Sequence, residues 1–195
     1  MEHDKKEIDT SLNRAEKDYL LAIARNAILG ELDMPQAHVA RQSNPILRSH
    51  RGAFVTLKIA GRLRGCIGYI EGSSPLQKTI ADMAKAAAFQ DPRFPALTAK
   101  EVPSVTIEIS ILSPLFPITQ PEEIEVGKHG LVIEQGYRRG LLLPQVASEY
   151  KWDRDVFLEH TCEKAGLAKD AWKDADTRIF VFSAQVFAEE EAGGR

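Results

Sequence analysis

Hydrophobic and polar residues follow two different periods along this chain of 195 residues. From Leu20 to Ala27 the apolar positions recur every three to four residues, which predicts an amphipathic helix of about 16 residues. Asn13 and Glu16 have the spacing of a capping box at its start, and Gly30 ends it. The stretch 31–51 has no regular period and predicts an irregular connection with room for one short helix.

From residue 52 the period changes to two, which is typical of extended strands. Residues 53–59 and 63–69 predict a β-hairpin with a two-residue turn at Ala60-Gly61. After a break, Ser74 and Gln77 again have capping-box spacing, with Pro75 as the first residue of the predicted helix.

The helix is expected to end before the loop Asp91-Pro92-Arg93-Phe94-Pro95, and residues 105–111 predict a further strand. The second half of the chain has a similar order of elements. Residues 131–134 and 141–143 flank a turn at Gly136, and Asp153 caps a predicted helix. Apolar residues alternate along 178–187, which predicts a final extended segment.

Both predicted hairpins contain the pattern G-x-x-R-G, once in 61–65 and once in 136–140. This is consistent with an internal duplication of residues 52–113 and 128–188, although two ordinary hairpins could share five residues by coincidence. The sequence therefore predicts an α+β fold, whose antiparallel sheets come from two β-β-α-β-like units packed with helices. One domain is expected over residues 12–188, between the polar tails 1–11 and 189–195.

Composition narrows the possible partners and the compartment. The net charge is −3, from 25 basic and 28 acidic residues, so no overall positive field favours nucleic acid or an anionic membrane. No apolar stretch is long enough for a membrane span or a signal peptide, and a cytoplasmic location is expected. Cys66 and Cys162 lie too far apart for a C-x-x-C pair, no histidine spacing is typical of a metal site, and no cofactor motif is present.

We expect a reactive site, if the chain has one, at the segment Arg64-Gly65-Cys66-Ile67-Gly68. Two glycines within a strand indicate a bulge or a close approach by another group, and an arginine beside a thiol favours the thiolate. Alternation along a regular strand places Arg64, Cys66 and Gly68 on one face, which makes Cys66 a candidate nucleophile and Arg64 a candidate anion-binding residue. The alternative is an inert packing thiol, because the two-residue turn places Cys66 opposite the apolar Val55.

Four more residues complete the candidate site. His129 opens the second hairpin and could act as a base, although an exposed turn histidine would have the same spacing. Asp91 and Arg93 are candidate binding residues because they share a short loop after a helix, a place that also serves simply to direct the next strand. Arg139 occupies the position in the second hairpin that Arg64 occupies in the first.

The hexapeptide Leu63-Arg64-Gly65-Cys66-Ile67-Gly68 resembles the hallmark of the AMMECR-one family, whose bacterial and archaeal members are called AmmeMemoRadiSam system protein A. The resemblance covers roughly positions 12–188. It extends through Asp91-Pro92-Arg93-Phe94, His129-Gly130-Leu131, Leu143-Pro144-Gln145-Val146-Ala147 and Trp152-Asp153. It implies an α+β fold of two unequal lobes with the hexapeptide facing a cleft, and an association with a Memo-like protein and a radical SAM protein, but no settled reaction.

Three functions are compatible with the sequence. The first is an enzyme or enzyme subunit that uses Cys66 on an unknown small molecule or modified macromolecule, together with those two partner proteins. The second is a non-catalytic adaptor that docks a partner through the same strand. The third, RNA binding through Arg62, Arg64, Arg138 and Arg139, ranks last because few aromatic residues lie near these arginines.

Overall fold

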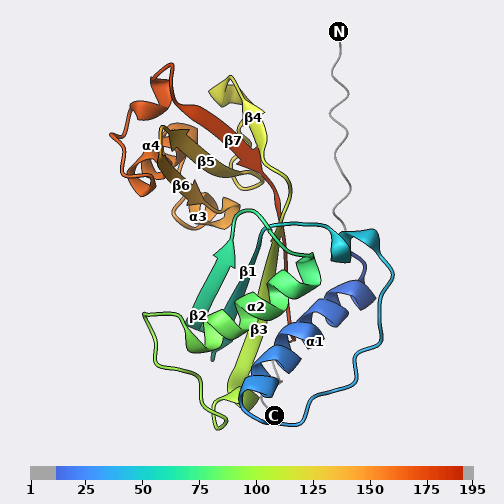
Figure 1. The fold of residues 1–195 in the computed structure, drawn as a ribbon. Helices are drawn as coiled ribbons and strands as arrows, with labels where there is room; N and C mark the ends of the chain where they lie inside the picture. The colour runs from blue at the N-terminus through green and yellow to red at the C-terminus, as the bar shows by residue number, and fades with distance from the viewer. Residues whose placement is uncertain (1–11, 191–195) are drawn as a thin grey trace. The chain divides into compact units, whose positions relative to one another are not determined.

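The computed structural model describes residues 12–190, so the predicted tail 1–11 and most of the tail 189–195 lie outside the described residues. By their internal contacts the described residues form two compact units of different size (Figure 1). Residues 12–112 and 185–190 form the first unit, and residues 113–184 form the second. Each unit contains one four-stranded sheet, and the predicted α+β fold with antiparallel sheets is confirmed.

The first unit packs two helices against one face of its sheet (Figure 1). Apolar side chains of both helices and of that sheet face form its core, in which Leu20, Leu57 and Ile107 are fully buried. The strand order is β2-β1-β3-β8. The elements of this unit are α1 (Arg14–Glu31), η1 (Pro45–Arg48), β1 (Ala53–Ile59), β2 (Arg62–Tyr69), α2 (Leu76–Phe89), η2 (Val102–Ser104), β3 (Val105–Leu112) and β8 (Ala184–Ala188).

The second unit repeats this plan on a smaller scale, with strand order β4-β7-β5-β6 and α4 packed on β5 and β6. Its core is built around Phe157, Leu158 and Leu131, all fully buried. Its elements are β4 (Phe116–Ile118), η3 (Pro121–Glu123), β5 (Gly130–Gln135), β6 (Arg138–Leu142), α3 (Pro144–Glu149), α4 (Arg154–Lys164), η4 (Ala171–Lys173) and β7 (Arg178–Phe182).

Two predicted helix starts are confirmed. The Asn13 side chain accepts the N–H of Glu16 while the Glu16 carboxylate accepts the N–H of Asn13, which completes the capping box of α1. Asp153 caps α4 by accepting the N–H of Val156 at 2.9 Å. Both signals lie within a few residues of the helix that they start, so no distant contact is needed to form them.

Two other predictions were wrong. No side chain caps α2, because the helix begins at Leu76 with Pro75 at the capping position, and the Ser74–Gln77 box does not form. The segment 178–187 is two strands, because the chain leaves the second sheet after β7 and enters the first sheet as β8. The short β4, which contains Pro117, was not predicted, since proline is confined to strand edges and weakens the sequence signal.

No helix among residues 12–190 has the length and apolar character that crossing a bilayer demands. Within the same range, no group of three or more His, Cys, Asp or Glu side chains is arranged to hold a metal ion.

Candidate functional site

A β-bulge in β2 decides where Cys66 lies. Lys58 pairs with Leu63, but Leu57 pairs with Gly65, so Arg64 is an extra residue in the ladder. Beyond the bulge the register is shifted by one, and Cys66 lies opposite Thr56. The predicted pairing of Cys66 with Val55 was therefore wrong, because a regular hairpin register does not account for an extra residue.

The bulge also changes which side chains share a face. A Cβ on Gly65 would lie 2.1 Å from the carbonyl oxygen of Ala87, so Gly65 faces α2. Cys66, its neighbour in the strand, faces the side of the sheet away from the helices. Leu63 shares this face through its pairing with Lys58. Arg64 is the unpaired residue of the bulge, so strand alternation no longer links its side chain to that of Cys66.

The Cys66 thiol lies on a polar part of this open face. Cys66 is half-buried, and its Sγ accepts a hydrogen bond from the Thr56 hydroxyl at 3.2 Å. Glu108 is the partner of Thr56 on β3, and its carboxylate pairs with the Lys58 ammonium at 2.8 Å. A hydroxyl, a cation and an anion thus accompany the thiol on one sheet face.

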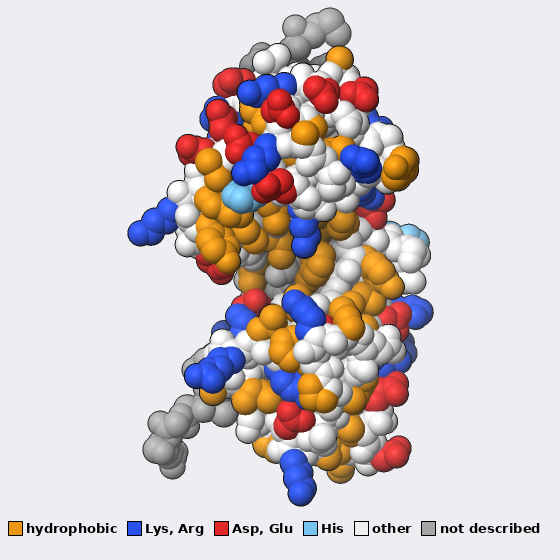
Figure 2. Space-filling view, turned by 90° about the vertical axis from the view of Figure 1, so that its left-hand side faces the viewer, with side chains coloured by type: hydrophobic (Ala, Val, Ile, Leu, Met, Phe, Trp, Pro, Cys, Tyr) orange, Lys and Arg blue, Asp and Glu red, His pale blue; other side chains and the backbone are white. Residues whose placement is uncertain are grey.

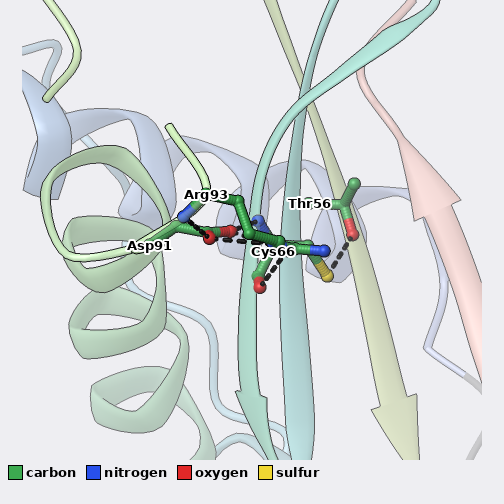
Figure 3. Close-up of polar contacts among 4 residues, drawn as sticks. All are labelled: Thr56, Cys66, Asp91 and Arg93. Atoms are coloured by element: carbon green, nitrogen blue, oxygen red, sulfur yellow. Dashed lines mark hydrogen bonds and ion pairs between the residues drawn. The ribbon is translucent and has the colours of Figure 1, made fainter. Parts of the chain in front are cut away.

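The main chain of Cys66 is held by Asp91 and Arg93 (Figure 3). The Cys66 N–H donates to Asp91 Oδ2 at 2.9 Å, and Arg93 Nη2 donates to the Cys66 carbonyl oxygen at 3.2 Å. Arg93 also donates to Asp91, from Nε at 2.9 Å and from Nη2 at 2.7 Å. Because β2 is the edge strand, the Asp91–Arg93 pair satisfies the polar groups that a neighbouring strand would otherwise bind.

Charge pairing sets the protonation of this loop. Hydrogen bonds from the Arg93 guanidinium hold the pKa of the buried Asp91 carboxyl well below its usual range, and the Cys66 N–H acts in the same direction. The pKa of Arg93 is raised in turn by Asp91. The pair therefore keeps both charges throughout the physiological pH range, and it fixes the Cys66 backbone while the thiol stays on the open face.

Arg64 has a different partner from the one that its position in the motif suggested. Its Nε donates to Glu101 Oε1 at 2.9 Å, and its side chain is 12% exposed. This hydrogen bond is the main cause that lowers the pKa of Glu101 to about 2. Thr98 donates to the same carboxylate through its N–H and its hydroxyl. Arg64 thus holds the loop that precedes β3, and Arg93 is the arginine that contacts Cys66.

Gly68 makes room for an aromatic ring. A Cβ at this position would lie 2.4 Å from the ring of Phe54, its cross-strand partner on β1. Phe54 therefore lies over the strand two residues beyond Cys66, on the same face as the thiol.

The other predicted residues belong to the second unit. His129 lies in a turn, where its Nδ1 accepts the N–H of Glu125 at 3.2 Å. Arg139 pairs with Glu134 on the neighbouring strand at 2.9 Å. The structure thus brings together Cys66, Asp91 and Arg93 within the first unit, whereas His129 and Arg139 are held by contacts within the second.

Sequence reasoning missed Thr56 and Glu101. Thr56 has no signal of its own, since its approach to the thiol depends on the bulge. Glu101 lies 37 positions from Arg64 in a loop without a motif, so no local pattern could pair them. Cys162, by contrast, is fully buried in α4 as expected, and burial raises the pKa of its thiol.

Three of the four arginines of the two hairpins have partners within the protein, and Arg62 is exposed. Arg64 and Arg139 are paired with carboxylates, and Arg138 donates to the carbonyl oxygen of Gly166 at 2.9 Å. On the face drawn in Figure 2, Lys and Arg side chains are interspersed with Asp and Glu. Such a mixed surface gives little support to a phosphate-backbone footprint.

Comparison with known proteins agrees with the family resemblance and with the fold class. The AMMECR1 family model matches residues 21–187. A protein of Methanothermobacter thermautotrophicus is 42% identical over 186 residues, which cover 92% of this chain and 97% of that protein. A protein of Methanosarcina mazei is 45% identical over 157 residues, or 77% of this chain and 78% of that protein.

Among solved structures, the crystal structure of an uncharacterized protein from Pyrococcus horikoshii superposes with a TM-score of 0.78 at 38% identity, covering 89% of this chain and 91% of that chain. The family model and the relatives each span most of the chain, so the protein belongs to the AMMECR1 family.

Proposed function

We propose that the protein is an enzyme or enzyme subunit whose reactive group is the Cys66 thiol on the open face of the first sheet. The observation that carries this proposal is the fixed main chain of Cys66, whose N–H and carbonyl oxygen are both bound by the Asp91–Arg93 pair. The pair satisfies the edge of β2, and it also holds the Cys66 backbone in place, as a nucleophile requires for its working position.

The surroundings of the thiol favour group transfer or thiol addition over a purely structural role. Thr56 donates a hydrogen bond to Sγ, which stabilises a thiolate. Lys58 lies on the same face and offers a positive charge to an anionic substrate, although Glu108 already pairs with it. The substrate class is a small molecule or a modified macromolecule.

The family resemblance extends the proposal to partners. A Memo-like protein and a radical SAM protein would supply or consume the substrate of this chain in the cytoplasm, where a free thiol stays reduced. His129 remains a candidate base and Arg139 a candidate binding residue in that complex.

Alkylation of the native protein tests the reactive thiol. Iodoacetamide labelling of Cys66 and Cys162 is followed by mass spectrometry across pH, with Thr56→Val and Arg64→Ala beside the wild type. We expect fast labelling of Cys66 in the folded protein, which slows in Thr56→Val and is unchanged in Arg64→Ala. Cys162 serves as the internal control because it should react only after unfolding.

Labelling of Cys66 that waits for unfolding would overturn the proposal. A functional test accompanies the labelling. Cys66→Ser should abolish the activity that depends on the Memo-like and radical SAM partners, while the melting temperature of the protein stays nearly the same.

A second candidate is a non-catalytic adaptor that docks a partner on β2. The observation in its favour is that Leu63 and Tyr69 of this edge strand are 43% and 57% exposed. Co-purification with the Memo-like or radical SAM protein should then be weakened by Leu63→Ser/Tyr69→Ser and unaffected by Cys66→Ser. Tyr137→Ser is the matched control, since Tyr137 is 93% exposed in the second hairpin.

A further inference from the structure

A second concave surface of the first unit lies apart from the Cys66 face, at the start of α2. An open cavity of about 760 Å³ is lined by three segments: Tyr19 and Ile23 of α1, the first turn of α2, and residues 41–48. This volume is within the range of small-molecule sites. The three segments lie side by side at the right of the first unit in Figure 1, where the N–H of Leu76 donates to the carbonyl oxygen of Ser49.

The lining of this cavity is cationic. Arg41, Arg48 and Lys78 line it, and no Asp or Glu does so among the described residues. The side chains of Arg41 and Arg48 form no ion pair or hydrogen bond with any of residues 12–190, whereas Lys78 pairs with Asp82 one turn further along α2. Two arginines without a counter-ion therefore face one hollow in a protein whose net charge is negative.

The acidic residue that α1 brings closest to this segment is already used. Glu16 is 8% exposed; one oxygen accepts the Asn44 side chain at 2.9 Å, and the other accepts the N–H of Asn13 at 2.8 Å. Its carboxylate serves the start of α1 and the loop before η1. It forms no ion pair with Arg41 or Arg48.

The start of α2 adds to the positive potential. Gln77 and Lys78 belong to its first turn, and no side chain caps this 14-residue helix. The N–H groups of Leu76, Lys78 and Thr79 already donate to the carbonyl oxygens of Ser49 and Pro75, and the N–H of Gln77 is not among them. The helix dipole at such an end favours an anion.

A buried cation lies beside the same helix end. Arg51 is 8% exposed and its Nη1 has no hydrogen-bond partner. Its Nε donates to the hydroxyl of Ser49, the residue whose carbonyl oxygen binds the first N–H of α2. An unpaired guanidinium is costly to bury, so its charge adds to the attraction for an anion at this end.

The walls of the cavity are held in place before any ligand arrives. The Tyr19 hydroxyl on α1 donates to Gln77 Oε1 on α2 at 3.1 Å. Leu47 is fully buried and anchors η1, which leaves Arg48 at the surface of the hollow. Asn44 caps η1 by accepting the N–H of Ile46 at 2.9 Å.

We propose that this cavity binds a small, multiply charged oxyanion, a metabolite that carries phosphate or several carboxylates. Arg41 and Arg48 pair with the charged oxygens, and the N–H of Gln77 at the start of α2 is a further donor. Tyr19 and Ile23 contact the body of the ligand. A small molecule fits better than a nucleic acid, because the two unpaired arginines converge on one hollow and do not track along a backbone. This site is independent of the function proposed for Cys66.

Calorimetric titration of the full chain tests this site, with inorganic pyrophosphate in one arm and citrate in the other. We expect at least one of these probes to bind, and Arg41→Gln/Arg48→Gln to weaken binding about tenfold or more. Arg62→Gln/Lys100→Gln is the matched control, since it removes the same two charges from exposed positions of the same unit that do not line the cavity.

Amide spectra of the same samples locate the binding. The resonances of Gln77 and Lys78 should shift on addition of the probe in the wild type and in Cys66→Ser alike, which separates this site from the thiol. A preference for pyrophosphate indicates a phosphate ligand, and a preference for citrate a polycarboxylate. The proposal is overturned by binding of neither probe, by equal weakening in both double variants, or by a short RNA that displaces the probe and binds more tightly.

Discussion

At Gly65 the backbone of β2 comes so close to α2 that no side chain fits. The nearest atom to an added Cβ would be the Ala87 carbonyl oxygen at 2.1 Å, which belongs to the helix backbone and cannot rotate away. The close approach fixes the strand residue that precedes Cys66. Gly65 of the hexapeptide is thus explained by packing against α2 and requires no ligand.

Gly65→Ala should destabilise the protein by about 2 kcal/mol, because the sheet and helix must separate to accept a methyl group. Urea unfolding of the wild type and the variant measures the difference. Gly61→Asn is the control, since the turn position has open space and a positive φ of 72° that asparagine tolerates. A loss below about 0.5 kcal/mol for Gly65→Ala would contradict the close contact.

The Asp91–Arg93 pair makes stability depend on pH. The pKa of Asp91 is lower in the folded protein than the unfolded value of about 3.9, so its carboxylate stabilises the fold above that pH and loses this contribution as the pH falls. Asp91→Asn should therefore cost about 2 kcal/mol at neutral pH, and the difference from wild type should shrink below about pH 4.

Unfolding curves at pH 7, 5 and 3, taken as rough sampling points, measure this difference. Asp18→Asn is the matched control, because Asp18 pairs with Arg14 at the surface, where both side chains are more than half exposed. A gap between wild type and Asp91→Asn that stays constant across pH would contradict the pairing.

At the scale of elements, the sequence predicted what depends on near neighbours. The α1 and α4 caps and the Ala60-Gly61 turn were found because their signals span two to four residues. The bulge at Arg64 and the missing cap of α2 were not found, because packing against distant parts of the chain decides them.

The candidate site shows the same difference between local signals, which the sequence carries, and contacts between distant residues, which it does not. Cys66, Asp91 and Arg93 were each singled out from local features, but their hydrogen bonds cross 25 and 27 positions of the chain, so the pattern did not reveal that they act together. The face that Cys66 shares with Thr56 was missed for the same reason, since it depends on one extra residue in β2.

The capping box of α1 gives a prediction for a whole element. Asn13→Ala should cost about 1 kcal/mol, because Glu16 loses the acceptor for its N–H. Asn13→Ser keeps a capping oxygen and should retain most of the stability. Thermal unfolding followed by circular dichroism compares the three proteins. Equal destabilisation by alanine and serine would mean that the cap contributes nothing.

For the whole molecule, the two sheets have matching strand orders. β2-β1-β3 corresponds to β6-β5-β7, and the fourth strand of each sheet comes from the other half of the chain: β8 follows β7 but joins β3, and β4 follows β3 but joins β7. We propose that residues 52–113 and 128–188 are copies of one ancestral unit within a single domain. Support comes from this reciprocal arrangement and from Gly65 and Gly140, each pressed against the end of a helix.

Cutting the chain between the halves tests the arrangement. Fragments 1–126 and 127–195 each contain a strand that completes the other's sheet, so we expect the two to co-purify as a folded pair and neither to fold alone. Cleavage at Gly127 suits this test, since the exposed residues 125–128 connect η3 to β5. A fragment that shows a cooperative thermal transition by itself would contradict the mutual dependence.

The place of β8 in the first sheet also has a consequence during synthesis. The ribosome makes β3 before residues 113–184, and β8 only after them. One edge of the first sheet therefore stays open while the second unit is translated, and at about 5–20 residues per second this interval lasts several seconds. Through that interval the nascent chain exposes a strand edge that another chain could pair with, so crowded expression favours misassembly at β3.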